Sequence, residues 1–208
     1  MSRSPSQSHK ATVFIAASEL DSNLYHATKF IAPDPFIYLE IKGERLMIMN
    51  DLEMDRAKSQ AAVDRVLSYS EIERRARDHG VATPGSVDIV HVVLRDAKIK
   101  HVLVPANFPY SHAARLQELG YQLHAKPDPF YEHRVIKTAE EVRHIEEAQR
   151  ATEDAVAAAH EMLRQATIQH GELWLDDGVL TSERVKKLIN VKLMERDCVA
   201  QHTIVAGG

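Results

Sequence analysis

The sequence changes character at Arg134-Val-Ile-Lys-Thr-Ala-Glu-Glu-Val-Arg-His-Ile-Glu-Glu-Ala148, which follows the proline-containing connector Lys126-Pro-Asp-Pro-Phe-Tyr131. Thr138 and Glu141 have capping-box spacing, in which the Thr side chain accepts from a backbone N–H and the Glu carboxylate reaches back. Apolar or small residues then recur every three or four positions, which predicts a long helix over 138–165. Its expected inward face consists of Val142, Ile145, Gln149, Thr152, Val156, Ala159 and Leu163.

Ahead of this helix, apolar runs alternate with segments of helical pattern. We expect strands at 12–17, 36–42, 45–50, 65–69, 100–105 and 121–125, and helices at 19–30, 52–62, 71–78, 85–97 and 110–119. Such alternation predicts an α/β domain over 12–126, with helices on the faces of its sheet. A hairpin turning at Gly43-Glu44 would make the sheet mixed. Ser70 is the expected N-cap of the helix that ends at Asp78.

The two ends of the chain differ from this domain. Residues 1–11 are polar and are interpreted as a disordered tail, and 127–137 as a linker. Residues 138–208 predict two helices, 138–165 and 181–196, with a loop at 167–180 and a short strand near 199–206. One strand cannot cover two apolar helix faces, so this part is expected to be an incomplete α+β domain. Either the chain is a truncation, or a partner supplies the missing sheet.

Composition narrows the class of protein. Thirty acidic against 26 basic residues give a net charge of −4, which argues against binding to nucleic acid or an anionic membrane. No apolar run approaches the roughly 20 residues of a membrane helix. The single cysteine, Cys198, excludes an intrachain disulfide and is expected to be buried. We therefore expect a cytoplasmic protein.

A search for catalytic or metal-binding patterns finds none. His160-Glu161 begins like a zinc-protease helix, but Arg164 stands where the second His would lie. Asp176-Asp177 lies in a predicted loop and is typical of a solvated turn. Six histidines are scattered without helical pairing: His79, His91, His101, His112, His124 and His133. We expect no catalytic residue and no metal ligand in this chain.

Several stretches together resemble a known family. The pattern Arg134-x-Ile-Lys-Thr-x-x-Glu-x-x-x-Ile-x-x-Ala148 is similar to the entry of the catalytic domain in pita-bread metallopeptidases, which include Xaa-Pro aminopeptidase, prolidase and creatinase. Four further stretches resemble segments of the same proteins: 21–30, 51–58, 180–185 and 202–208. The resemblance covers nearly all of the chain after residue 12. It implies a creatinase-type amino-terminal domain over 12–126 and the beginning of a pita-bread domain over 138–208.

The resemblance also implies an activity that this chain does not complete. Relatives of aminopeptidase P hold two divalent metal ions (manganese, cobalt or zinc) through two Asp, one His and two Glu, and hydrolyse the peptide bond next to proline. Those ligands would follow Gly208. The chain is therefore expected to be an inactive portion of a metallopeptidase that binds its metals and its peptide substrate in the full-length form.

In such relatives the amino-terminal domain forms oligomer contacts and narrows the entrance to an active site. The resemblance thus implies a homodimer or higher oligomer, with Tyr25 and His26 as candidates for controlling substrate access. A competing interpretation makes Tyr25 and Phe30 core residues of a helix. Two alternative functions remain open: a non-catalytic binding or assembly module, and a fragment of a creatinase-like amidinohydrolase.

Overall fold

A computed structural model describes residues 10–176 and 178–206. The chain divides into two compact units, Met1–Val135 and Ile136–Gly208, each described below by itself. Most of the expected tail, residues 1–9, lies outside the described residues, as do Asp177, Gly207 and Gly208. The first strand already begins at Lys10, within the range expected to be tail.

Unit 1 is built on a six-stranded sheet in the order β4-β3-β2-β1-β5-β6. Its strands are β1 (Lys10–Ala16), β2 (Phe36–Ile41), β3 (Glu44–Met49), β4 (Arg65–Ser68), β5 (His101–Pro105) and β6 (Gln122–Lys126). Only β2 is antiparallel to its neighbours, while the pairs β1–β5, β5–β6 and β3–β4 are parallel. The expected mixed α/β sheet is confirmed. Five of its strands therefore end at the same edge, which we call the carboxyl edge.

The antiparallel strand arises from a tight hairpin. Ile41 pairs with Glu44, so the two turn residues are Lys42 and Gly43 rather than Gly43 and Glu44 as expected. Both have positive φ, 54° and 85°. Two consecutive residues of this kind give a turn whose twist matches that of the flanking strands.

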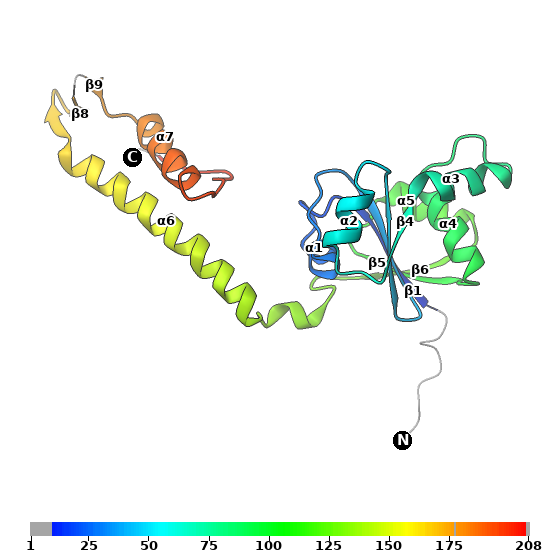
Figure 1. The fold of residues 1–208 in the computed structure, drawn as a ribbon. Coiled ribbons are helices and arrows are strands. Elements are labelled where there is room, and N and C mark those ends of the chain that lie inside the picture. The colour runs from blue at the N-terminus through cyan, green and yellow to red at the C-terminus, as the bar shows by residue number, and fades with distance from the viewer. Residues whose placement is uncertain (1–9, 177, 207–208) are drawn as a thin grey trace. The chain divides into compact units, whose positions relative to one another are not determined.

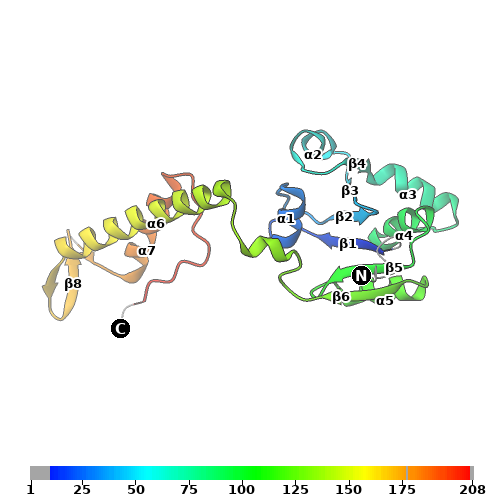
Figure 2. The same cartoon turned by 90° about the horizontal axis from the view of Figure 1, so that it is seen from below.

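Helices cover both faces of this sheet (Figures 1 and 2). They are α1 (Ser22–Thr28), α2 (Met54–Gln60), α3 (Tyr69–Asp78), α4 (Ser86–Asp96) and α5 (Tyr110–Glu118). Successive side chains of a strand point to opposite faces. Val13 accordingly lies in the core under α3–α5, whereas Phe14 lies in the core with residues of α1 and α2. Each expected helix in this unit is present, with α1 and α2 shorter than expected.

The start of α3 differs from the expectation. Ser68 is the N-cap and its Oγ accepts from the backbone N–H of Glu71, at 3.2 Å. Ser70 instead donates its hydroxyl to Asp51 Oδ2, at 2.7 Å. Ser68 has the extended backbone that an N-cap needs, whereas Ser70 already lies inside the helix. The helix therefore begins at Tyr69, two residues before Glu71, the first helical residue that a cap at Ser70 predicts.

Unit 2 pairs two helices, α6 (Ala139–Gln165) and α7 (Ser182–Met194). The predicted start of α6 is confirmed: Thr138 Oγ1 accepts from the N–H of Glu141, and the Glu141 carboxylate accepts from the N–H of Thr138. The prediction of a loop at 167–180 is wrong. This stretch contains three short, paired strands: β7 (Thr167–Gln169), β8 (Glu172–Leu175) and β9 (Gly178–Val179).

The expected strand near 199–206 is also wrong. Residues 198–206 are irregular, since no other described strand pairs with them. Cys198 is half-buried rather than buried, and its thiol lies 3.4 Å from the carbonyl oxygen of Arg196. Within 10–176 and 178–206, no helix combines the length and the apolar character needed to cross a membrane.

The buried face of α6 is a row of small residues. Ala151, Ala155 and Ala159 are at most 5% exposed, and the row recurs every four residues. The larger side chains of the predicted inward face are 41–55% exposed in this structure: Val142, Ile145, Val156 and Leu163. Of the predicted stripe, only Ala159 is buried.

Candidate functional site

One hollow of about 290 Å³ opens at the carboxyl edge, beside the ends of β5 and β6. It is lined by the start of α1, by Pro105-Ala106-Asn107 after β5, and by Lys126, Asp128 and Phe130 after β6. In sheets of this kind the carboxyl ends of parallel strands are the usual place for ligands. Polar groups and one apolar ring therefore meet where a small polar molecule could be held.

A second hollow of about 290 Å³ lies at the same edge, beside the end of β1, the start of β2 and the end of β3. Its apolar walls come from Pro33, Pro35 and Phe36, and its polar rim includes Asn50 and Glu53. The loop before β2 forms one side of this hollow, so the position of that loop sets its width.

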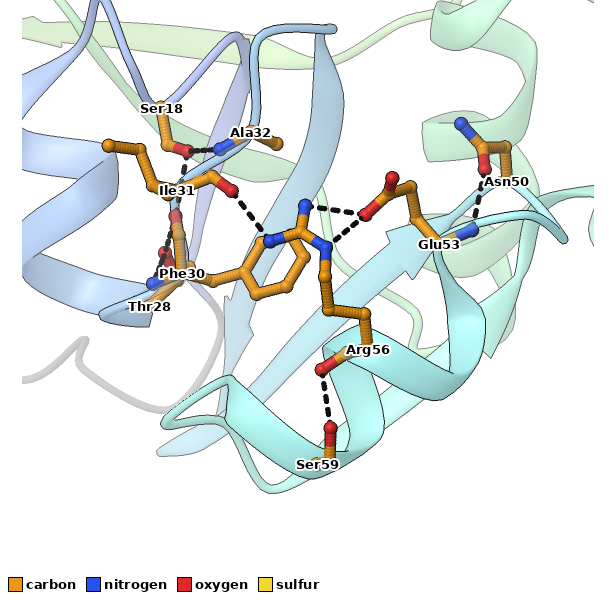
Figure 3. Close-up of polar contacts among 9 residues, drawn as sticks. All are labelled: Ser18, Thr28, Phe30, Ile31, Ala32, Asn50, Glu53, Arg56 and Ser59. Carbon is orange, nitrogen blue, oxygen red and sulfur yellow. Dashed lines mark hydrogen bonds and ion pairs between the residues drawn. The ribbon is translucent and has the colours of Figure 1, made fainter.

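Arg56 of α2 fixes that loop (Figure 3). Its guanidinium donates to the Ile31 carbonyl at 3.0 Å and to the Glu53 carboxylate at 2.6 Å. It also lies over the Phe30 ring, 4.1 Å from the centroid. On the far side of the loop, Ser18 Oγ donates to the Phe30 carbonyl and accepts from the N–H of Ala32. The loop beside the second hollow is thus held by buried contacts to Ser18 and by more exposed contacts to Arg56.

Helix α1 carries the two residues expected to control substrate access. Tyr25 is 43% exposed, so the competing interpretation of Tyr25 as a core residue is wrong. Phe30 is buried at 1%, but it follows the helix, which ends at Thr28. His26 is half-buried on the same helix. The role of Tyr25 and His26 in substrate access stays a prediction.

In the structure His26 contacts His133, a residue far from it in the sequence. Nε2 of His26 lies 2.8 Å from Nε2 of His133, in the 3-10 helix η2 (Glu132–Val135). The Tyr131 ring lies 5.8 Å from each of the two imidazole rings. These three aromatic side chains form what we call the His26–Tyr131–His133 cluster. The contact joins positions 107 residues apart, so no local sequence pattern indicates it.

The stretch after β6, expected to be a linker, is tied to α1 within unit 1. Asn23 Nδ2 donates to Asp128 Oδ1 at 2.8 Å, and Arg134 donates to Asn23 Oδ1 and to Ser22 Oγ. Phe130 is 3% exposed and belongs to the core under α1 and α2. Residues 128–134 are therefore part of the surface around α1.

Two tyrosines with shifted pKa lie beneath this surface. Burial raises the pKa of the Tyr38 hydroxyl to about 12. Burial, and then the adjacent Tyr38, also raises the pKa of Tyr131 well above its usual value. Both hydroxyls thus remain protonated across the ordinary pH range, and neither can serve there as a base.

The acidic candidates Glu161 and Asp176 have separate surroundings. Glu161 forms an ion pair with Arg164 at 3.7 Å, and Asp176 occupies an exposed turn with φ of 58°. In the described ranges no three His, Cys, Asp or Glu side chains lie close enough together to hold a metal ion. The two-metal site implied by the resemblance therefore does not fit these residues, and they support no catalytic step through it.

Comparison with solved structures identifies the fold. The chain is similar to X-Pro aminopeptidase from Thermotoga maritima MSB8, with a TM-score of 0.68 and 15% identity over 90% of this chain and 47% of that one. It is similar to Xaa-Pro dipeptidase from Bacillus anthracis, with a TM-score of 0.65 and 12% identity over 89% and 44%. It is also similar to prolidase from Pyrococcus furiosus, with a TM-score of 0.57 and 16% identity over 89% of this chain and 49% of that one. No family model matches the sequence, and no curated protein matches it.

These similarities define the class of fold. The solved structures that the chain resembles are X-Pro aminopeptidases and prolidases, as the sequence resemblance implied. Its mixed six-stranded sheet flanked by helices is the fold of their amino-terminal domain. The chain spans slightly less than half the length of each of these proteins.

Proposed function

We propose that this chain is the amino-terminal half of a peptidase that hydrolyses the bond next to proline. The observation that carries the proposal is the TM-score of 0.68 to an X-Pro aminopeptidase over 90% of this chain. The match includes both units, so it is not limited to a common α/β sheet. At 15% identity this likeness establishes the fold, and the hydrolase activity is the proposal.

The catalytic ligands are proposed to come from sequence that follows this chain in the full-length protein. Two divalent metal ions, manganese, cobalt or zinc, would supply the water activation there. The exposed apolar face of α6, which includes Val142, Ile145 and Val156, supports this proposal. An apolar stripe of this length is normally covered by another layer of secondary structure.

For unit 1 we propose a role in oligomer contacts and substrate access. On α1, Tyr25 is exposed and His26 is half-buried, and the bulk of the tyrosine ring could limit the length of an entering peptide. In a homodimer or higher oligomer this surface would face the active site of a neighbouring subunit.

The test uses the full-length protein, expressed from a reading frame extended beyond Gly208. We expect hydrolysis of Xaa-Pro dipeptides and tripeptides that needs manganese or cobalt and stops with a chelator. Hydrolysis of creatine instead would favour the amidinohydrolase alternative. Binding of a partner without hydrolysis of any of these substrates would favour the assembly module and contradict the peptidase proposal.

The access role has its own test in the same protein. Tyr25→Ala is expected to improve kcat/KM for longer peptides and to leave that for dipeptides unchanged, because only long substrates would meet the ring. Leu52→Ala is the matched control, since Leu52 is 95% exposed and lies outside α1. An equal effect on short and long peptides would contradict the access role.

A further inference from the structure

The nitrogen atoms of two histidines converge at the surface of unit 1. His26 Nε2 and His133 Nε2 lie 2.8 Å apart, with ring centroids separated by 4.8 Å and ring planes inclined at 53°. His26 is half-buried and His133 is exposed, so water and dissolved ions can reach the pair. By contrast, the rings of His101 and His124 are stacked nearly parallel at 17°, with centroids 5.9 Å apart. Convergence of ring nitrogens is thus not a general result of neighbouring histidines in this fold.

Contacts of two residues close to His133 in sequence, Tyr131 and Arg134, fix the position of His133. Tyr131, two residues before His133, stacks at 6.3 Å on the core residue Phe14. Arg134, directly after His133, donates to Ser22 Oγ at 2.9 Å, at the start of the helix that carries His26. Because the backbone on each side of His133 is anchored, the two imidazoles are pre-positioned rather than brought together by chance rotamers. Preorganisation of this kind is what a binding site needs.

The geometry is close to that of two ligands on one metal ion. A neutral imidazole nitrogen is among the commonest metal ligands in proteins. Two N–metal bonds of about 2.0–2.1 Å at a tetrahedral angle place their nitrogens about 3.3 Å apart. The observed 2.8 Å is the distance of a hydrogen bond between the two rings. A metal ion would replace that hydrogen bond, with the two nitrogens moving apart by only about half an ångström. Rotation of the exposed His133 ring can supply that movement without a shift of the backbone.

We propose that His26 and His133 together bind a borderline divalent cation of the class that takes imidazole ligands, namely Zn²⁺, Ni²⁺ or Cu²⁺. The two imidazoles supply two of the ligands, and water completes the coordination. Hard cations such as Mg²⁺ and Ca²⁺ are excluded, because they need oxygen ligands. This proposal departs from the expectation of no metal ligand in the chain. It rests on the geometry of unit 1 alone and is independent of the proposed peptidase function.

A bound cation would link α1 to η2 across 107 residues of sequence. Only the folded chain holds the two rings together, so the metal stabilises the fold by mass action. The second imidazole also raises affinity through effective concentration, commonly by about 10²–10⁴-fold. Removal of either histidine is therefore expected to weaken binding by about 100-fold.

The first experiment measures Zn²⁺ and Ni²⁺ binding to the full chain by calorimetry, together with the metal-dependent rise in Tm. We expect one site per chain, with an affinity that falls by about 100-fold in His26→Gln and equally in His133→Gln. The matched control is His124→Gln, which removes an imidazole from the stacked pair and should bind like the parent chain. An affinity like that of the parent chain in both His26→Gln and His133→Gln would place the metal elsewhere and overturn the proposal.

A second measurement needs no variant, so it stands even if a substituted chain folds poorly. Electron paramagnetic resonance of one equivalent of Cu²⁺ on the unmodified chain counts the imidazole nitrogens coupled to the metal. Two coupled imidazoles are expected. One or none would overturn the proposal.

Discussion

Phe130 packs edge to face on Phe14, with ring centroids 4.9 Å apart. Phe14 lies in the central strand β1, whereas Phe130 lies beyond the last strand, in a stretch whose prolines suggested a linker. Phe130 is 3% exposed, so its ring is a full member of the core under α1 and α2. The contact brings the residues that follow β6 back over the sheet, close to His26.

Phe130→Ala is expected to destabilise unit 1 by about 3–5 kcal/mol, the usual cost of emptying the space of a buried Phe. All six tyrosines of the chain lie in unit 1, so urea unfolding followed by tyrosine signals reports this change. The matched control is Tyr110→Ala, because Tyr110 is 86% exposed and its loss should cost less than about 0.5 kcal/mol. Equal midpoints for the two variants would show that Phe130 does not belong to the core.

Arg56→Lys is expected to destabilise unit 1 by about 1–2 kcal/mol, although it keeps the charge. A lysine cannot lie flat over Phe30 while donating to both the Ile31 carbonyl and the Glu53 carboxylate. The loop should loosen, which amide hydrogen exchange at Ala32 would detect as faster exchange. Lys58→Ala, at an exposed position of the same helix, is the control and should leave that exchange rate unchanged. Slow exchange at Ala32 in Arg56→Lys would contradict the role of the guanidinium.

The cap of α3 gives a comparison between two nearby serines. Ser68→Ala should cost about 1 kcal/mol, since it removes the acceptor for the Glu71 N–H and a hydrogen bond to Asp51. Ser70→Ala removes only one exposed hydrogen bond and should cost less. Urea unfolding of the two variants decides the order. A larger cost for Ser70→Ala would restore the cap that the sequence alone suggested.

The carboxylate of Asp51, which accepts from both serines, makes the stability of unit 1 depend on pH. The hydroxyls of Ser70 and then Ser68 hold the pKa of Asp51 below its ordinary value. The unfolded chain therefore binds a proton more readily, and the stabilisation is present above the unfolded pKa and lost as pH falls through the folded pKa. Asp51→Asn should lower stability at about pH 7, and this deficit should shrink as pH falls through the lowered pKa of Asp51. The control is Asp55→Asn on α2. A deficit in Asp51→Asn that is as large in acid as at neutral pH would contradict this account.

The helices and strands that could be predicted from the sequence are those with a long run of patterned residues or with a capping box at the helix start. The α6 start follows from Thr138 and Glu141 because both partners lie within one turn, and the strands of unit 1 follow from buried runs such as that around Phe14. The two serines near α3 could not be ranked, since the choice depends on backbone angles and on Asp51, which is distant in sequence. Strands β7–β9 have two to four residues each, too few for a periodicity to appear.

The candidate site was predicted only in part, because its contacts join residues that are distant in sequence. Tyr25 and His26 were placed correctly on a helix near the first strand, but their neighbours come from residues 128–134. Contacts over more than 100 residues depend on the register of the whole sheet. The predicted stripe of α6 likewise failed to identify the face that packs, since the alanine row fits closely against its neighbours while the larger residues remain outside.

This alanine row gives the last prediction. Ala155 is fully buried on α6, whereas Ala157, two positions on, is exposed. Ala155→Leu should destabilise unit 2 by about 1–3 kcal/mol, because there is no room for three further carbons in a packed contact. Ala157→Leu makes the same chemical change at an exposed site and should stay within about 0.5 kcal/mol of the parent. The only tryptophan of the chain, Trp174, lies in unit 2, so its fluorescence follows the unfolding of that unit. Should the two leucine variants unfold at the same urea concentration, the alanine row would not be the packing face of α6.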